Sequence, residues 1–327
     1  MQSNPAQASL LLLDKDVVEQ LLTPAEVTQA VRDAFLLHGH HEGRVFQVVR
    51  EKLSTGGVFG IKSGDVASQK LLGFKAAGFW PSNRQRGGEP HQATILLFDP
   101  ETGRPLCVID GNAITTVRTG AAGGLGLETL ARKDSRCLTV FGTGVQARSQ
   151  LRFALRTLPH LAVVHYVSTN RKANPDFEAA FAGQCEMRCA HDADKAVSES
   201  DVVITATPGV APLFDAHAVR AGTHFNCVGA DTAGKRELPS GVLERARLVV
   251  ADDRAQATQL GELQWAPGTP SVELGALLLG QEQFVRAHSD ITVFDMTGLA
   301  LQDLTVARLI YERASQQSLG SRIAWPW

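Results

Sequence analysis

The sequence predicts an α/β protein that combines a Rossmann-type, doubly wound parallel sheet with a separate α+β domain. Three observations lead to this prediction. A glycine-rich turn at Gly142–Gly144 follows a short apolar strand, strand and helix patterns alternate from residue 135 onward, and the preceding residues have a different character. We expect a first domain at 1–125, to which 300–327 return, and a Rossmann domain at 126–299.

Composition fits two globular domains and excludes several classes of protein. The 327 residues are 44% hydrophobic and carry a formal net charge of −2, so no basic field for nucleic acid or anionic membranes is expected. No apolar run approaches the roughly 20 residues of a membrane helix, and Met1–Pro5 lack the basic start of a signal peptide. Five cysteines without a CxxC pair indicate reduced thiols in a cytoplasmic protein.

The first domain begins with helices and continues with short strands. Asp16–Leu37 is helical in pattern but broken at Thr23–Pro24, because threonine caps helices and proline suits their first position. Thr94–Asp99 and Pro105–Ile109 predict two strands joined by a Pro-Glu-Thr-Gly turn. Asn112–Leu130 is rich in alanine and glycine, which predicts a helix that packs closely on its neighbours.

The second domain alternates between strands and helices, beginning with a helix at Val145–Leu158. This alternation predicts a parallel sheet. A last helix at Ala300–Ala314 is expected to return to the first domain. The predicted strands are Cys137–Phe141, Val163–Val167, Glu186–Cys189, Val202–Ala206, Thr223–Val228, Leu248–Ala251 and Ile291–Phe294.

The glycine-rich turn has the pattern of a dinucleotide-binding site. Gly142 and Gly144 allow a tight turn and close approach of a pyrophosphate to backbone N–H groups, while Ala147 replaces the usual third glycine. A purely structural turn is the alternative. The placement between a strand and a helix favours a nucleotide, with cofactor contacts expected at Gly142, Thr143, Gly144, Val145 and Gln146.

The end of the second Rossmann strand indicates which nicotinamide cofactor is used. An acid there would bind the ribose hydroxyls of NAD, but Thr169, Asn170 and Arg171 stand in its place. Arginine pairs with phosphate through a fork of donors, so these residues favour NADP(H). NAD(H) with a solvated turn remains the alternative.

Several segments together resemble the ornithine cyclodeaminase/mu-crystallin family. The resemblance implies hydride transfer between a nicotinamide and the α-carbon of an amino or imino acid. It also implies a substrate-binding and dimerisation domain that forms a homodimer, with the NAD(P)-binding Rossmann domain inserted in it. The segments are Gly73–Lys75, Thr115–Ala122, Phe141–Ala147, Val228–Leu238, Asp295–Gly298 and Gln302–Asp303.

By this resemblance, Arg50, Lys75 and Arg118 hold the substrate carboxylate, and Lys75 also takes part in proton transfer. Asp231 follows an apolar strand and faces the substrate nitrogen, where it stabilises an iminium and relays a proton. For each residue another interpretation stays open. Arg50 could be an ordinary strand cation, Lys62 is a rival anion contact, and Asp231 could cap a helix.

Further cofactor contacts are expected at Thr116, Thr205, Ala206, Thr207, Val228, Gly229, Asp295, Thr297 and Gly298. Among weaker candidates, His91 could line the pocket, and Glu262 and Glu273 are most simply surface or capping carboxylates. We expect no metal site at the histidines or cysteines, which are His38, His40, His41, Cys185 and Cys189.

The favoured function is an NAD(P)H-dependent reductase of an imino acid or a cyclic ketimine such as Δ1-pyrroline-2-carboxylate. The alternatives are an ornithine cyclodeaminase with recycling NAD, an alanine dehydrogenase-like enzyme and a non-catalytic crystallin-like binding protein. The missing acid after the second strand argues against NAD, and Phe79 and Trp80 suggest an apolar pocket wall. Partners are therefore a small amino or imino acid and a second copy of the chain.

Overall fold

The computed structural model describes residues 8–326. The chain divides into two compact units. Unit 1 comprises Met1–Arg118 and Leu299–Trp327, and unit 2 comprises Thr119–Gly298. The segment Met1–Pro5, on which the signal-peptide prediction rests, lies outside the described residues. Within the described residues, every helix is too short or too polar to cross a membrane.

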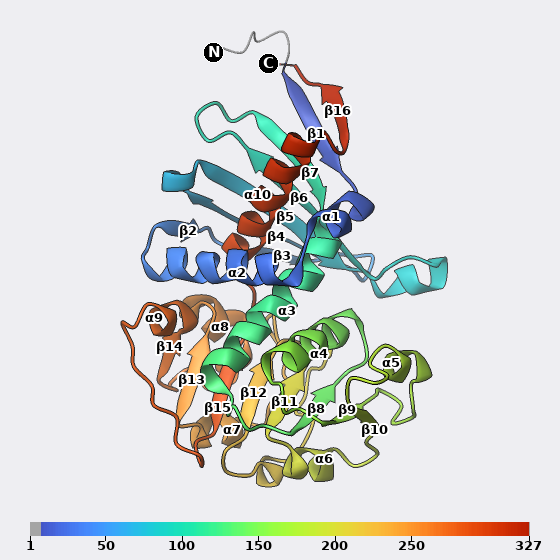
Figure 1. Cartoon of the computed structure of the whole chain (residues 1–327), viewed down its shortest axis with the longest axis vertical. Helices are drawn as coiled ribbons and strands as arrows, with labels where there is room; N and C mark the ends of the chain where they lie inside the picture. Colours follow the sequence, from blue (N-terminus) through green and yellow to red (C-terminus); the bar gives the residue numbers. More distant parts are fainter. Residues whose placement is uncertain (1–7, 327) are drawn as a thin grey trace. The chain divides into compact units, whose positions relative to one another are not determined.

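Unit 1 is built on an eight-stranded sheet, seen at the top of Figure 1. Its strands are β1 (Ser9–Leu13), β2 (Gly43–Val45), β3 (Val49–Lys52), β4 (Val58–Val66), β5 (Leu71–Phe79), β6 (His91–Phe98), β7 (Pro105–Asp110) and β16 (Ser321–Ala324). The order is β16-β1-β7-β6-β5-β4-β2, and β3 also pairs with β4. All pairs are antiparallel except β1 with β7. The predicted strand pair at 94–99 and 105–109 is confirmed as β6 and β7.

The predicted helical break at Thr23–Pro24 is confirmed. Helix α1 (Lys15–Leu21) ends before it, and α2 (Pro24–Gly39) starts at the proline. The Thr23 hydroxyl accepts a hydrogen bond from the Glu26 N–H and donates one to the Glu26 carboxylate, so Thr23 is the side-chain N-cap of α2. Short 3₁₀ turns follow at η2 (Ala67–Gln69) and η3 (Pro81–Arg86).

Helix α10 (Ala300–Gln317) lies across one face of this sheet and contacts β4, β5, β6 and α2 (Figure 1). A glycine permits the close approach. A Cβ at Gly73 would lie 2.8 Å from Leu304 Cδ2 and 2.5 Å from the Leu96 carbonyl oxygen. Because the helix lies so near the sheet, polar side chains on its inner side come within hydrogen-bonding reach of side chains on the strands.

Unit 2 confirms the predicted doubly wound parallel sheet. Its strands are β8 (Cys137–Phe141), β9 (Val163–Val167), β10 (Glu186–Cys189), β11 (Val202–Thr205), β12 (His224–Cys227), β13 (Leu248–Ala251), β14 (Ser271–Glu273) and β15 (Thr292–Asp295). They lie in the order β10-β9-β8-β11-β12-β15-β13-β14, and every pair is parallel. The sequence did not predict β14, because three residues are too few to show a period.

The helices of unit 2 connect these strands. They are α4 (Val145–Thr157), α5 (Pro175–Ala179), α6 (Ala193–Glu199), α7 (Ser240–Arg245), α8 (Arg254–Leu260) and α9 (Leu274–Leu278), with 3₁₀ turns η4 (Ala216–Ala218) and η5 (Glu262–Trp265). Helix α3 (Gly111–Leu130) is shared, because the boundary between the units falls after Arg118. The chain order reverses on either side of β8, which is where open α/β sheets bind ligands.

Candidate active site

Basic side chains gather on the face of the unit 1 sheet that α10 covers. Lys62 on β4 and Lys75 on β5 are directly opposite each other in the antiparallel register, so both point to this face. Arg50 on β3 is opposite Gly60, two residues from Lys62, and therefore shares it. The absence of a side chain at Gly60 makes room for arginine, because a Cβ there would lie 3.1 Å from Arg50 Cδ.

A single carboxylate joins two of the buried cations of unit 1. Asp303 on α10 places Oδ2 2.7 Å from Lys75 Nζ and accepts a hydrogen bond of 2.9 Å from Arg118 Nε at Oδ1. Arg118 also donates to Gln302 Oε1 at 2.9 Å, and Lys75 donates to the Thr115 hydroxyl at 3.2 Å. The structure thus brings the predicted residues Lys75 and Arg118 together through a residue of α10.

Burial sets the electrostatics of this cluster. Removal from water lowers the pKa of Lys75 to about 7, with a further contribution from the positive charge of Arg118. Arg118 and Lys75 hold the pKa of the Asp303 carboxyl below its usual value, although burial opposes them. Asp303 is therefore charged, while Lys75 exchanges its proton near neutral pH, as a group in proton transfer requires.

Asp303 and Gln302 are functional candidates to which the sequence assigned no role. They stand out in the sequence only as a polar pair between Leu301 and Leu304. The structure explains why such a pair is buried, since both side chains face Arg118. A buried arginine without an acceptor would carry a large desolvation penalty.

The glycine-rich turn of unit 2 has the conformation that a dinucleotide site needs. Gly142 has φ +101°, and a Cβ there would lie 2.7 Å from the Ala206 carbonyl oxygen. Gly144 is the N-cap of α4 and faces open space, whereas Ala147 is fully buried beneath it. This cradle fits a pyrophosphate against the N-terminus of a 13-residue helix. Asn174 also donates to the Thr143 hydroxyl at 3.2 Å, which holds the turn.

The predicted selectivity segment forms a tight turn after β9. The Asn170 side chain accepts from the Lys172 N–H at 3.1 Å and from the Ser168 hydroxyl, and Arg171 adopts φ 58°. Arg171 donates to the His191 carbonyl at 3.4 Å. Its side chain lines a hollow of about 460 Å³ in unit 2, together with His191–Asp194 and Pro212–Asp215. Thr169, Asn170 and Arg171 are all exposed there.

Four strands of unit 2 end in register, which places their loops along one edge of the sheet. Phe141 pairs with Thr205, Thr205 with Cys227, and Cys227 with Asp295. The predicted contacts at 142–146, 205–207, 228–229 and 297–298 therefore lie at the same edge. Thr297 donates to Asp252 at 2.8 Å and the Gly298 N–H donates to the same carboxylate, which holds the last of these loops.

Buried carboxyl groups tie these loops together. Glu237 accepts from the Thr207 N–H and hydroxyl, both at 2.7 Å, and from the Gly229 N–H at 2.8 Å. Glu262 in turn accepts from the Glu237 N–H at 2.7 Å, and Asp295 accepts from the Leu263 N–H at 2.9 Å. Burial, together with the charges of neighbouring acids, raises the pKa of Glu262 to about 8 and that of Asp295 to about 7. The expectation of Glu262 as a surface carboxylate is wrong, since only 1% of it is exposed.

Asp231 lies in the loop after β12, beside Lys235, to which the sequence assigned no role. Its Oδ1 is 2.6 Å from Lys235 Nζ and accepts a 3.1 Å hydrogen bond from the Thr232 hydroxyl. Lys235 also donates to the Gly229 carbonyl at 3.1 Å. The alternative of a helix cap does not hold, because the next helix, α7, has Pro239 as its N-cap.

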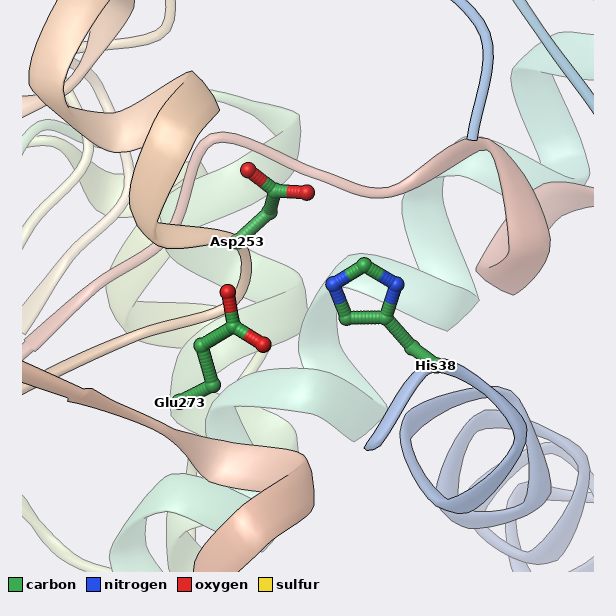
Figure 2. A group of neighbouring side chains, drawn as sticks. All are labelled: His38, Asp253 and Glu273. Atoms are coloured by element: carbon green, nitrogen blue, oxygen red, sulfur yellow. The ribbon is translucent and has the colours of Figure 1, made fainter. Parts of the chain in front are cut away.

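The remaining candidates have mainly structural contacts. The Thr116 hydroxyl donates to the Asn112 carbonyl at 2.8 Å within α3, and His91 Nδ1 lies 2.8 Å from Asn112 Oδ1. Figure 2 shows the side chains of Asp253 and Glu273, both of unit 2, near the start of α8. Asp253 accepts from the Gln256 N–H at 2.7 Å and Glu273 from the Arg254 N–H at 3.0 Å, which confirms Glu273 as a capping group. His38, also drawn there, belongs to the last turn of α2 in unit 1.

Comparison with known proteins finds one family whose model matches most of this chain. The family model described as "Ornithine cyclodeaminase/mu-crystallin family" matches residues 8–318. The iminosuccinate reductase of Paracoccus denitrificans is 32% identical over 325 residues, which cover 96% of this chain and 99% of that protein. The Thermococcus litoralis Δ1-pyrroline-2-carboxylate reductase, solved with NADH and L-proline, is 29% identical with a TM-score of 0.89, covering 96% and 100%. An archaeal alanine dehydrogenase dimer with bound NAD is 32% identical with a TM-score of 0.89, covering 97% and 99%.

The lowered pKa of Lys75 predicts a specific pH dependence of stability. Between pH 7 and 10.5 the unfolded chain keeps a proton that the folded chain has lost, so Lys75 makes the free energy of unfolding rise with pH. The slope reaches at most about 1.4 kcal/mol per pH unit. Denaturant unfolding at several pH values should therefore show a stability difference between wild type and Lys75→Met that changes with pH. The exposed Lys52→Met is the control, and a pH-independent difference for Lys75→Met would contradict the assignment.

Proposed function

The chain belongs to the ornithine cyclodeaminase/mu-crystallin family and is an NAD(P)-dependent oxidoreductase acting on carbon–nitrogen bonds, and we propose that it reduces a 2-imino acid to the amino acid. One observation carries this proposal. Lys75 and Arg118 are buried in unit 1 around the single carboxylate of Asp303. Two buried cations that share one anion retain a net positive charge, which suits the carboxylate of a 2-imino acid.

In this proposal Arg50, Lys75 and Arg118 bind the substrate carboxylate. Arg118 is oriented by Asp303 and Gln302, so its planar fork keeps a constant direction without substrate. Lys75 has its pKa near 7 and can supply a proton to the substrate nitrogen at neutral pH. Unit 1 accordingly serves as the substrate-binding domain and unit 2 as the dinucleotide-binding domain.

The Rossmann unit is proposed to hold the cofactor through the cradle at Gly142–Val145 and the loops after β11, β12 and β15. When bound, a nicotinamide supplies the hydride that reduces the imine carbon. Asp231 favours the iminium form of the substrate by its negative charge, and Lys235 holds that carboxylate in place. Glu237 acts as a positioning residue, because it fixes the backbone at Thr207 and Gly229.

The relatives support this reaction class and leave one second candidate. The reductases from Paracoccus and Thermococcus are named for imino acids, and the archaeal relative is named an alanine dehydrogenase. An amino-acid dehydrogenase runs the same carbon–nitrogen chemistry in the opposite direction. Both candidates need the basic cluster of unit 1 to bind a carboxylate. The assay must therefore measure both imine reduction and amino-acid oxidation.

The activity is tested by oxidation of NADPH and NADH with a panel of 2-oxo acids plus ammonia, together with cyclic imines. Asp231→Asn keeps the shape of the side chain and removes its charge. We expect kcat to fall by about 10²- to 10⁴-fold, the usual scale for acid–base catalysis, with cofactor affinity unchanged. The exposed Asp176→Asn is the control. Near wild-type turnover in Asp231→Asn would refute the role given to this residue.

We propose NADP(H) as the preferred cofactor. Support comes from the turn after β9, where Arg171 is exposed at a hollow and no acid stands at 168–172 to meet the ribose hydroxyls of NAD. The guanidinium of Arg171 can pair with a 2′-phosphate in a forked, charge-assisted contact.

Cofactor titration by fluorescence tests this preference. NADPH should bind more tightly than NADH to the wild-type protein. Arg171→Ala should weaken NADPH by roughly 1.5–3 kcal/mol, the range for hydrogen bonds to charged groups, and leave NADH almost unchanged. Arg152→Ala, an exposed arginine of α4, is the control. Equal or tighter NADH binding by the wild type would overturn the preference.

We propose that the protein is a cytoplasmic homodimer formed through the open face of the unit 1 sheet. This face points away from Lys62 and Lys75, and its apolar side chains are partly exposed in the chain described. The Phe74 and Phe98 rings lie there 5.8 Å apart. A broad apolar sheet face needs a cover, and a second copy supplies a self-complementary one. The apolar residues of this face include Phe59, Ile61, Leu72, Phe74, Ala76, Leu96, Phe98 and Val108, and the polar residues Ser63, Asp65 and Thr94 lie on it as well.

Light scattering at micromolar concentration should give twice the monomer mass. Leu96→Glu places a charge at the centre of this face, opposite Phe74 and Val108, and should shift the protein toward monomer. Val285→Glu changes an apolar residue that is 92% exposed in unit 2 and should leave the mass unchanged. A wild-type monomer would contradict the proposal.

A further inference from the structure

Asn174 links two loops of unit 2 that follow neighbouring parallel strands. It lies in the segment after β9, and its side chain reaches the glycine-rich turn after β8. Asn174 Nδ2 donates to Thr143 Oγ1 at 3.2 Å. The same segment carries Arg171, so one loop contacts the glycine-rich turn and also lines the hollow of unit 2.

The backbone and the side chain of Asn174 are both held in place. Its N–H donates to the hydroxyl of Tyr166 at 2.9 Å, and this hydroxyl, on a buried residue of β9, donates to the Glu178 carboxylate. Its Oδ1 accepts from the Phe177 N–H at 3.0 Å, which makes Asn174 the N-cap of α5. Because Oδ1 is the acceptor of that bond, the other end of the amide is the NH2 group, which can only donate.

The amide group of Asn174 therefore determines how the Thr143 hydroxyl uses its single proton. A hydroxyl can accept and donate at the same time, and the bond from Asn174 occupies a lone pair of Thr143 Oγ1. The proton is left for another acceptor, and the donation from Asn174 polarises the hydroxyl and makes it a stronger donor. Thr143 is half-buried and the next two residues, Gly144 and Val145, are exposed, so a ligand can reach the turn.

We propose that Asn174 is a positioning residue for the cofactor pyrophosphate, because it orients the Thr143 hydroxyl to donate its proton to a phosphate oxygen. This inference rests on the proposed cradle at Gly142–Val145 and adds a residue that lies outside it. The pyrophosphate is common to NADPH and NADH, so Asn174 contributes equally to the binding of both. Arg171, in contrast, is proposed to contact the 2′-phosphate of NADPH alone.

Substitutions that keep the cap of α5 test this role. Serine and aspartate are as good N-caps as asparagine, so both variants should unfold at nearly the wild-type temperature. Serine is too short to reach Thr143, and an aspartate carboxylate would accept the Thr143 proton instead of donating. In fluorescence titrations, the Kd values for NADPH and NADH should rise equally, by about 3- to 10-fold in Asn174→Ser and about 10- to 100-fold in Asn174→Asp.

A double-mutant cycle shows whether Asn174 acts through Thr143. Thr143→Val removes the hydroxyl and should raise both Kd values about 10- to 100-fold, whereas Thr143→Ser keeps it and should stay within about threefold of wild type. Adding Asn174→Ser to Thr143→Val should change Kd by less than about twofold, because the hydroxyl that Asn174 orients is gone. Asp14→Ser, at the N-cap of α1 in unit 1, is the control for a cap change and should alter neither Kd.

The outcomes separate failure of this inference from failure of the cradle. Unchanged affinities in Asn174→Ser, losses that multiply in the double variant, or a loss confined to NADPH would overturn the role of Asn174 and leave the cradle standing. Thermal unfolding without cofactor checks the fold, and Asn174→Ser decides the matter if the aspartate variant is unstable. If the wild type binds neither cofactor, the cradle itself is wrong and the inference falls with it.

Discussion

The arrangement of unit 1 depends on the two ion pairs that the Asp303 carboxylate makes with Lys75 and Arg118. The carboxylate lies wholly buried between Lys75 and Arg118 and joins a strand, α3 and α10, which are distant in sequence. Without it, two cations would be buried beside each other without compensation, at a cost of several kcal/mol. With it, Arg118 keeps one orientation and Lys75 keeps a pKa near 7. A single acid thus makes a buried basic site compatible with a stable fold.

At the loops of unit 2 the buried charged groups are acids, and their partners are backbone N–H groups rather than cations. These loops carry the cradle and Asp231, and loops are mobile unless something holds them. Glu237, Glu262 and Asp295 accept N–H groups from neighbouring loops, so each buried acid fixes a connection rather than binding a cation. Their raised pKa values are the cost of placing several carboxyls together away from water. The two units therefore use buried charge for different purposes.

Much of the fold and part of the site could be predicted from the sequence. Apolar runs bounded by turn residues located most strands of unit 2 within two residues, and Thr23–Pro24 located a helix start, because these signals are local. Asp303 received no role, since its partners are 185 and 228 residues away and only tertiary packing reveals them. The burial of Glu262 was missed for the same reason, as its partners are backbone N–H groups of a distant loop. The register that aligns Lys62 with Lys75 likewise depends on strand pairing, which a spacing of 13 residues does not disclose.

The left-handed backbone of Arg171 has a consequence for engineering this protein. A side chain at φ 58° costs roughly 1–2 kcal/mol relative to a relaxed conformation, and glycine would avoid that cost. Selection for heat resistance alone would therefore favour glycine at this position. The guanidinium at the edge of the hollow lined by His191–Asp194 and Pro212–Asp215 would be lost with it. Thermostable variants should accordingly be screened on cofactor discrimination as well, because at this residue backbone relaxation and the proposed contact with a 2′-phosphate act against each other.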